Sequence, residues 1–279
     1  MVLLPHGHIV EKVGEASPPP WWIVTTRLQG AELTGFVHSG HLEHVPEPAP
    51  EAAALPAPPA VHWKEENPLV TPQTAERRAS PIGDPNRPRR LGADPAVRRS
   101  ELAALIDYLS VDISPRYQPT SSATYCNIYA YDYCYLAGVF LPRVWWDSEA
   151  LRRIDRGEAV KPEYGRTIEE VSANGLYRWL RGMGHSFGWM PVTDETVLQS
   201  AANEGRIGLV CAHHQNPNAS GHISAVVPET DTQKAARQGD SVLRPLQSQA
   251  GRKNHRYFSG PQAWWRGPQF REFGYWIHD

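Results

Sequence analysis

The stretch 125-YCNIYAYDYCYLAGVFLP-142 indicates how the C-terminal part of this 279-residue chain folds. Apolar and aromatic residues fill it almost without a break, which predicts a buried helix, and Gly138 and Pro142 are expected to end that helix. The turn-rich sequence RYQPTSSAT at 116–124 comes directly before it. Cys126 therefore stands where an irregular loop meets the start of the helix.

Helix signals come first in this region and strand signals afterwards. Apolar residues at helical spacing predict three further helices, at 97–111 with Ser100 as its cap, at 167–184 and at 194–205. Three β-rich runs bounded by Gly, Pro or Asn occupy 206–212, 221–229 and 241–251. This order predicts an α+β domain over residues 91–279, with helices packed on an antiparallel sheet.

Two different segments precede that domain. Residues 1–45 read as short strands, because WWIVTTRLQGAELTGFVHSGHLEHV (21–45) alternates apolar and polar positions between glycines. Residues 46–90 begin with PEPAPEAAALPAPPA, and proline at this density removes amide donors and disfavours helix. We expect a small all-β domain at 1–45 and a semi-rigid, Pro-rich linker at 46–90.

Charge and hydropathy narrow the classes of partner. The net charge of −2, without a block of like charge, gives no reason to expect nucleic acid. The longest apolar stretches, such as 207–212, are far shorter than the roughly 20 residues that cross a bilayer, so we expect no membrane span. The first 14 residues lack the cationic and apolar segments of a signal peptide, which predicts synthesis in the cytoplasm.

Each of the three cysteines must be interpreted separately, because together they have neither the number for a disulfide framework nor the paired spacing of a zinc site. Cys126 stands at a helix start, where backbone N–H groups and the helix dipole favour a thiolate, so it is a candidate nucleophile. Cys134 lies two turns further along the helix and Cys211 lies in a strand-like apolar run, so both are expected to be packing residues. We expect no metal and no cofactor.

A histidine at the start of a later strand supplies the matching base. In Gly221-His222-Ile223-Ser224-Ala225-Val226-Val227 the side chain of His222 projects to one face, and Gly221 is expected to give access beside it. An imidazole there can take the thiol proton and later protonate a leaving amine.

Four segments together carry a resemblance to a known family: TYCNIYAYD (124–132), AGVFLP (137–142), LQSAANEGRIGLVCA (198–212) and GHISAVVPE (221–229). In order and spacing they resemble the papain-like cell-wall amidases, the clan that includes the CHAP amidases, over about 120 to 150 residues. The resemblance implies a papain-like fold for 91–279, with Cys126 as nucleophile and His222 as base. The backbone N–H of Cys126 would help to hold the oxyanion.

A third, orienting residue is expected on the strand after the histidine strand. Gln247 and Gln249 are two residues apart and so share a face of that strand. We choose Gln249, with Glu229 and Gln247 as alternatives.

Other polar residues of the domain have simpler interpretations. Adjacent strand residues point to opposite faces, so His213 and His214 do not predict a metal site. His185 is expected in a loop that lines the cleft. Asp132 lies almost two turns along the helix and is expected on its surface or in a buried hydrogen bond. The ten tryptophans fit core packing, with sugar or peptide binding as the alternative.

The N-terminal segment carries a second resemblance. The sequences Leu4-Pro5-His6-Gly7, Trp21-Trp22-Ile23-Val24 and Gly35-Phe36-Val37-His38 resemble a bacterial Src-homology-three-like barrel without its usual first strand. Such a module would tether the enzyme to cell wall, and the alternative is a small barrel that only packs on the next domain.

These resemblances predict a peptidoglycan hydrolase that cuts an amide bond through an acyl-enzyme on Cys126. The bond could be the sugar-to-alanine amide or a peptide bond, and the site of action would be the cell wall, reached after phage lysis or by export without a signal peptide. The alternatives are a papain-like acyltransferase or transglutaminase-type enzyme, and a catalytically silent wall-binding protein.

Overall fold

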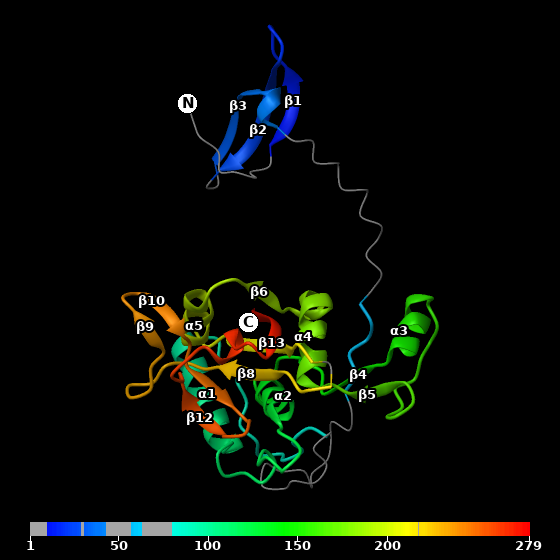
Figure 1. Ribbon diagram of the computed structural model, residues 1–279, viewed down its shortest axis with the longest axis vertical. Coiled ribbons are helices and arrows are strands. Elements are labelled where there is room, and N and C mark those ends of the chain that lie inside the picture. The colour runs from blue at the N-terminus through cyan, green and yellow to red at the C-terminus, as the bar shows by residue number, and fades with distance from the viewer. Residues whose placement is uncertain (1–9, 29–30, 43–56, 63–79, 217) are drawn as a thin grey trace. The chain divides into compact units, whose positions relative to one another are not determined.

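The structure, a computed structural model, describes residues 10–28, 31–42, 57–62, 80–216 and 218–279 (Figure 1). The chain divides into two compact units, Met1–Leu55 (unit 1) and Pro56–Asp279 (unit 2). Over these described residues, no helix has the length and apolar character that a membrane crossing requires.

Unit 1 contains a three-stranded antiparallel sheet in the order β1-β2-β3, made of β1 (Glu11–Glu15), β2 (Trp21–Leu28) and β3 (Ala31–His38). Strands β2 and β3 pair along their whole length, from Trp21 opposite His38 to Leu28 opposite Ala31. A 3-10 turn, η1 (Ser39–His41), follows β3. Two of the motifs read as barrel strands therefore form adjacent strands.

The predicted barrel is not closed within the described part of unit 1. Its three strands form an open sheet, of which only Val24 among the described side chains is buried, and Phe36 is 67% exposed. A barrel closes only when its edge strands pair, and no such pairing is present here. The motif Leu4–Gly7 lies outside the described residues.

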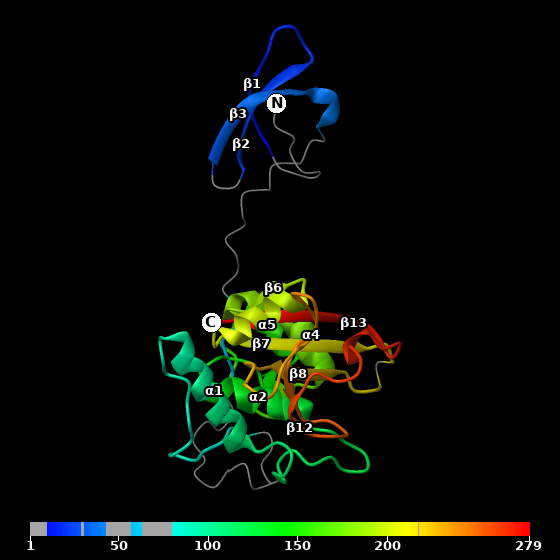
Figure 2. The same ribbon diagram turned by 90° about the vertical axis from the view of Figure 1, so that its left-hand side faces the viewer.

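Unit 2 is a mixed α+β structure, as the order of helix and strand signals predicted. Its main sheet is antiparallel, with the strand order β12-β11-β8-β7-β13-β6. The strands are β6 (Met190–Val192), β7 (Ile207–His214), β8 (His222–Val226), β11 (Gln247–Gln249), β12 (His255–Phe258) and β13 (Phe270–His278). Figure 2 shows β13 running alongside β7.

Helices cover both faces of this sheet. The described helices are α1 (Pro95–Leu109), α2 (Cys126–Leu136), α3 (Ser148–Asp155), α4 (Ala173–Gly182) and α5 (Glu195–Asn203). On β7 the side chains of Leu209 and Cys211 join the core under α1, α2 and α4, whereas Val210 and Ala212 join the core under α5. Strand β7 is apolar from Ile207 to Ala212 because alternate residues enter two different cores.

Two of the predicted helices begin elsewhere than expected. Helix α1 is capped by Asp94, which accepts from two backbone N–H groups of the first turn, with Pro95 as the first helical residue. Ser100 lies inside the helix and is not its cap. In the segment 167–184 the first residues form a strand, β5 (Ile168–Glu170), paired with β4 (Val144–Trp146), and α4 starts only after Ser172, its cap.

The strand predicted at 241–251 is two strands separated by Pro245. The first, β10 (Ser241–Arg244), pairs with β9 (Ala236–Gln238) in a small separate sheet, and the second is β11 of the main sheet. Proline cannot donate to a strand ladder, so it separates the two.

Parts of the segment predicted as a linker (46–90) belong to unit 2 and contact its helices and strands. Residues 57–62 contact β4, where the Trp146 indole donates to the carbonyl of Pro59 at 2.9 Å. Within residues 80–90, Ile82 is fully buried, and the Arg90 guanidinium donates to the carbonyl of Gly205 at 2.7 Å. The rest of the segment lies outside the described residues.

Candidate active site

Cys126 is the first residue of α2, and α2 packs directly on β8 (Figures 1 and 2). Tyr125, the residue before it, gives no side-chain hydrogen bond to cap the helix. The first N–H groups of a helix have no partner within the helix, so they remain to act on the sulfur of Cys126 or on a ligand.

His222 is the first residue of β8, and Gln249 is the last residue of β11, the adjacent strand. Their side chains meet: the His222 Nε2 atom lies 2.5 Å from Gln249 Oε1. Because an amide oxygen only accepts, Nε2 carries the proton and donates it. In the neutral ring Nδ1 is then the basic nitrogen, free to take a proton from a thiol.

The thiol of Cys126 is acidic in spite of its burial. Burial alone would raise its pKa, but attraction to the imidazolium of His222 and a side-chain interaction with that ring act in the opposite direction, as do the backbone N–H groups of Ile223 and Asn127. The combined effect holds the pKa of Cys126 below its usual value of 9.0. The site therefore favours the nucleophilic form of sulfur.

The pKa of the His222 imidazole shifts in the opposite direction to that of Cys126. Burial lowers its pKa, but the Cys126 thiolate and the hydrogen bond to Gln249 outweigh burial and raise the pKa above 6.5. A thiolate and an imidazolium thus stabilise each other at this position.

Trp264, in the 3-10 turn η3 (Trp264–Arg266), is a site residue that the sequence interpretation missed. Its ring meets the His222 ring edge-on, with the ring centroids 4.5 Å apart. The indole N–H donates to Gln247 Oε1 at 2.8 Å, and the buried Ser224 hydroxyl donates to the same oxygen at 2.6 Å. Gln247, an alternative for the orienting residue, therefore holds Trp264 against the imidazole and does not bind His222 itself.

Glu229, the other alternative, lies away from His222. Its carboxylate forms an ion pair with Arg237 and accepts from Asn203, and these contacts lower its pKa to about 2. Of the three candidates for the orienting role, the structure brings only Gln249 into contact with the imidazole.

Gly221 has a different role from the one expected. It is buried, and a Cβ atom at this position would collide with the carbonyl of Ala212 and with the side chain of Asn174. The Asn174 side chain also accepts from the N–H of His214 and donates to the carbonyl of Ala219. Glycine is needed for this close packing, which fixes where β8 begins, and not for access to His222.

The other two cysteines are fully buried, and burial raises the pKa of each thiol. Asp132 is also buried: it accepts from Arg116 Nε at 2.6 Å and from the Tyr117 hydroxyl at 2.8 Å. These residues are parts of the core and not of the site.

The other histidines considered as candidates have separate contacts. His213 contacts Arg178 and the ring of Tyr177, His214 packs on Phe270, and His185 is exposed in the 3-10 turn η2 (Gly184–Phe187). Within the described ranges no three His, Cys, Asp or Glu side chains gather in a way that could hold a metal ion.

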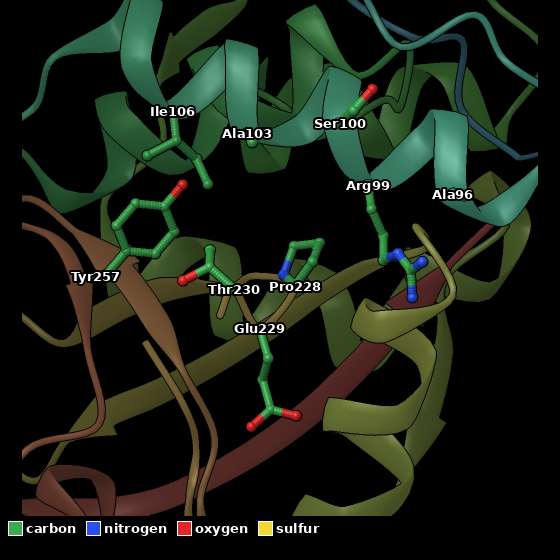
Figure 3. Close-up of a pocket in the computed structure, with 9 residues that line it drawn as sticks. All are labelled: Ala96, Arg99, Ser100, Ala103, Ile106, Pro228, Glu229, Thr230 and Tyr257. Carbon is green, nitrogen blue, oxygen red and sulfur yellow. The ribbon is translucent and has the colours of Figure 1, made fainter. Parts of the chain in front are cut away.

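The residues of the site differ in exposure. His222, Gln249 and Trp264 are partly exposed, whereas Cys126 is only 2% exposed. A separate cavity of about 250 Å³ lies between α1 and the residues after β8, and Figure 3 shows the side chains that line it, with the Glu229 carboxylate directed away from α1. None of Cys126, His222 and Gln249 lines this cavity.

We found no match to this chain among protein-family models, among curated proteins or among solved structures.

Proposed function

We propose that unit 2 is a papain-like cysteine hydrolase that cuts amide bonds of cell-wall peptide, with Cys126 as nucleophile, His222 as acid and base, and Gln249 as the orienting residue. The observation that carries this proposal is the mutual pKa shift of Cys126 and His222, together with the 2.5 Å contact between His222 Nε2 and Gln249 Oε1. Perturbed pKa values that arise from a specific partner are typical of catalytic groups.

The first half of the reaction forms an acyl-enzyme. The Cys126 thiolate attacks the amide carbonyl carbon, and the carbonyl electrons move to oxygen, where N–H groups at the start of α2 stabilise the charge. The C–N bond then breaks as the His222 imidazolium gives its proton to the leaving amine. The acyl group remains on sulfur as a thioester.

The second half releases the acyl group by hydrolysis. Neutral His222 takes a proton from water, and the hydroxide attacks the thioester carbonyl. The C–S bond breaks, which frees the carboxylic product and restores the thiolate beside the imidazolium. Gln249 accepts from Nε2 throughout and keeps the imidazole in the orientation that directs Nδ1 toward the reacting atoms.

The choice of cell-wall peptide as substrate comes from the resemblance of the sequences around Cys126 and His222 to the papain-like cell-wall amidases. A connected unit 1 that binds wall would raise the local concentration of unit 2 at an insoluble polymer.

The 2% exposure of Cys126 favours a second candidate function, a catalytically silent wall-binding protein whose cysteine serves packing alone. The hydrolase requires a substrate carbonyl to reach the sulfur from the side of His222, the partly exposed member of the pair. Activity on soluble wall fragments separates the two candidates, because a silent protein would leave them intact.

The test is digestion of purified peptidoglycan followed by mass spectrometry of the fragments. The wild-type protein should release fragments that have gained one water at an amide bond, and Cys126→Ala and His222→Ala should each release none while keeping the wild-type circular dichroism spectrum. His185→Ala, which changes an exposed histidine outside the site, is the matched control and should remain active. Activity retained in Cys126→Ala would overturn the proposal, and transfer of the acyl group to an added amine in preference to water would favour an acyltransferase.

A further inference from the structure

A second concave surface of unit 2 carries an excess of positive charge. It is a hollow of about 500 Å³ between α4, β7 and β13, and its lining includes Tyr177, Arg178, Arg181, His213, Arg271 and Glu272. We call it the basic hollow. Three guanidinium groups face one carboxylate there, so the hollow has a net positive charge at neutral pH.

A β-bulge places one of these arginines in the hollow. The pairing of β13 with β7 shifts between Phe270 and Glu272, which leaves Arg271 as the extra residue. In a regular strand Arg271 and Glu272 would point to opposite faces, but a bulge re-aims a side chain, and both of these residues line the hollow.

The three arginines of the hollow differ in the hydrogen bonds and ion pairs that their side chains already make. Arg181 forms an ion pair with Glu272 at 3.0 Å, and Arg178 donates to His213 Nε2 at 3.0 Å. The side chain of Arg271 is exposed and makes neither a hydrogen bond nor an ion pair to any residue in the described ranges. Since guanidinium has five N–H donors, Arg178 and Arg271 retain most of their donors for a ligand.

His213 accepts a hydrogen bond from Arg178. A guanidinium only donates, so Nε2 of His213 is the acceptor in this contact. His213 thus positions Arg178. A planar, fixed guanidinium suits bidentate binding of a carboxylate or phosphate.

The basic hollow lies on the Cys126 side of the sheet, at the end of β7 where β8 begins. Cys211, two residues before His213 and on the same face of β7, is near enough to Cys126 for their charges to interact. His222 pairs with Ala212, the residue of β7 next to His213, so the two histidines lie at the same end of the sheet but on opposite faces of it. With strands about 4.8 Å apart, β13 runs about 10 Å from β8, a span of about three extended peptide residues.

We propose that the basic hollow binds an oxyanion of the substrate, a free carboxylate of the wall peptide about three residues from the amide that Cys126 attacks. The choice of a wall peptide rests on the proposed function, whereas the oxyanion chemistry rests on the arginines alone. Inorganic phosphate is also an oxyanion that arginine side chains bind, so the test compares it with the peptide carboxylate.

The test is calorimetric binding to the full chain carrying Cys126→Ala, which removes turnover. The probes are a soluble wall peptide with free carboxylates, the same peptide with its carboxylates amidated, and inorganic phosphate. The binding variant adds Arg178→Gln and Arg271→Gln. The control variant instead adds Arg152→Gln, an exposed arginine of α3 that pairs with Glu149.

We expect the carboxylate peptide to bind at least tenfold more weakly to the double-arginine variant than to the Cys126→Ala protein. Amidation of the peptide should reduce its affinity for the Cys126→Ala protein by the same factor. The Arg152→Gln control should bind the carboxylate peptide as tightly as the Cys126→Ala protein does. Binding should also weaken as salt is added. Equal binding by the double-arginine variant, or by the amidated peptide, would overturn the basic hollow as an oxyanion site. Phosphate that binds more tightly than the peptide, and through the same arginines, would overturn the carboxylate assignment. Because binding is measured without catalysis, failure here is separate from failure of the Cys126→Ala digestion test.

Discussion

At Cys126 two effects of opposite sign act on the same thiol. Burial opposes the charged form, while the imidazolium of His222 and the N–H groups of Ile223 and Asn127 favour it, and the second effect is the larger. Burial also raises the pKa of Cys134, and there only the charge of Arg90 acts in the opposite direction. The pKa of Cys134 is therefore raised. The difference between these two buried cysteines of one helix comes from their partners.

Gln249 should determine the basic limb of the pH–rate profile. The hydrogen bond to Gln249 helps to raise the pKa of His222, so the imidazolium persists to higher pH and is lost as the pH rises through that raised value. Gln249→Ala should move the basic limb to lower pH and reduce the rate by about 10- to 100-fold, because the ring also loses its orientation. Gln249→Glu should move this limb to higher pH, since a carboxylate stabilises imidazolium more strongly.

The measurement is the rate of release of soluble wall fragments as a function of pH for the wild type and both variants. A basic limb that stays in place in Gln249→Ala would show that the contact with His222 does not affect its titration. Gln247→Ala, on the same strand, is the control substitution. It should displace Trp264, but it should not shift the basic limb to lower pH as Gln249→Ala does.

At the scale of the element, the start of β8 depends on the absence of a side chain at Gly221. Gly221→Ala would bring a Cβ atom against the carbonyl of Ala212 and the side chain of Asn174. We expect it to lower the free energy of unfolding by about 1–3 kcal/mol, as overpacking of a filled site does, and to reduce activity by displacing His222.

Gly182→Ala is the matched control for Gly221→Ala. A Cβ atom at Gly182, the last residue of α4, would meet no atom within 4 Å, and alanine is the better helix former. Urea denaturation should show unchanged or slightly raised stability for Gly182→Ala. Equal stability of Gly221→Ala and the wild type would contradict the close packing at β8.

The elements that the sequence predicted well are those with a strong local signal. The helix at Cys126 and the strand at 206–212 have long apolar runs, and α5 has its cap at Asp194. Strand β13 was missed because FREFGYWIH mixes charged residues with apolar ones, although it lies between β7 and β6 in the main sheet. A strand in that position gains its stability from neighbours distant in sequence, which local patterns do not reveal.

The candidate site shows the same limit. Cys126 and His222 could be proposed from a helix start and a strand start, and Gln249 from the alternation of side chains along a strand. Trp264 could not, because it reaches His222 through a turn more than 40 residues later in the chain, and its position depends on the hydrogen bond to Gln247 and on packing against Trp265 and Phe270.

At the scale of the whole molecule, a buried ion pair connects the segment before α1 to the helix that carries Cys126. Arg116 pairs with Asp132 of α2 at 2.6 Å, both side chains are fully buried, and Arg116 also donates to the carbonyl of Ser80 at 2.8 Å. Dense proline in 46–60 favoured the linker interpretation of 46–90, but the sequence gives no sign that Ser80 is held by a buried arginine.

Asp132→Ala should lower the free energy of unfolding by about 3–5 kcal/mol, because it leaves the Arg116 guanidinium buried without its counter-charge. The control is Glu149→Ala, which removes an exposed ion pair with Arg152 and should cost no more than about 1 kcal/mol. Chemical denaturation followed by tryptophan fluorescence measures both. If Asp132→Ala lowers the free energy of unfolding as little as the control does, the Arg116–Asp132 pair does not hold the segment around Ser80 to α2.

The most direct test of the reactive pair is the pH dependence of the alkylation of Cys126 by iodoacetamide, read residue by residue by mass spectrometry. Cys126 should react with a midpoint clearly below pH 9.0, His222→Ala should move that midpoint upward, and Cys134 and Cys211 should stay unlabelled in the folded protein. A midpoint at or above pH 9.0, or a Cys126 that the reagent never reaches, would contradict a thiolate nucleophile at this site.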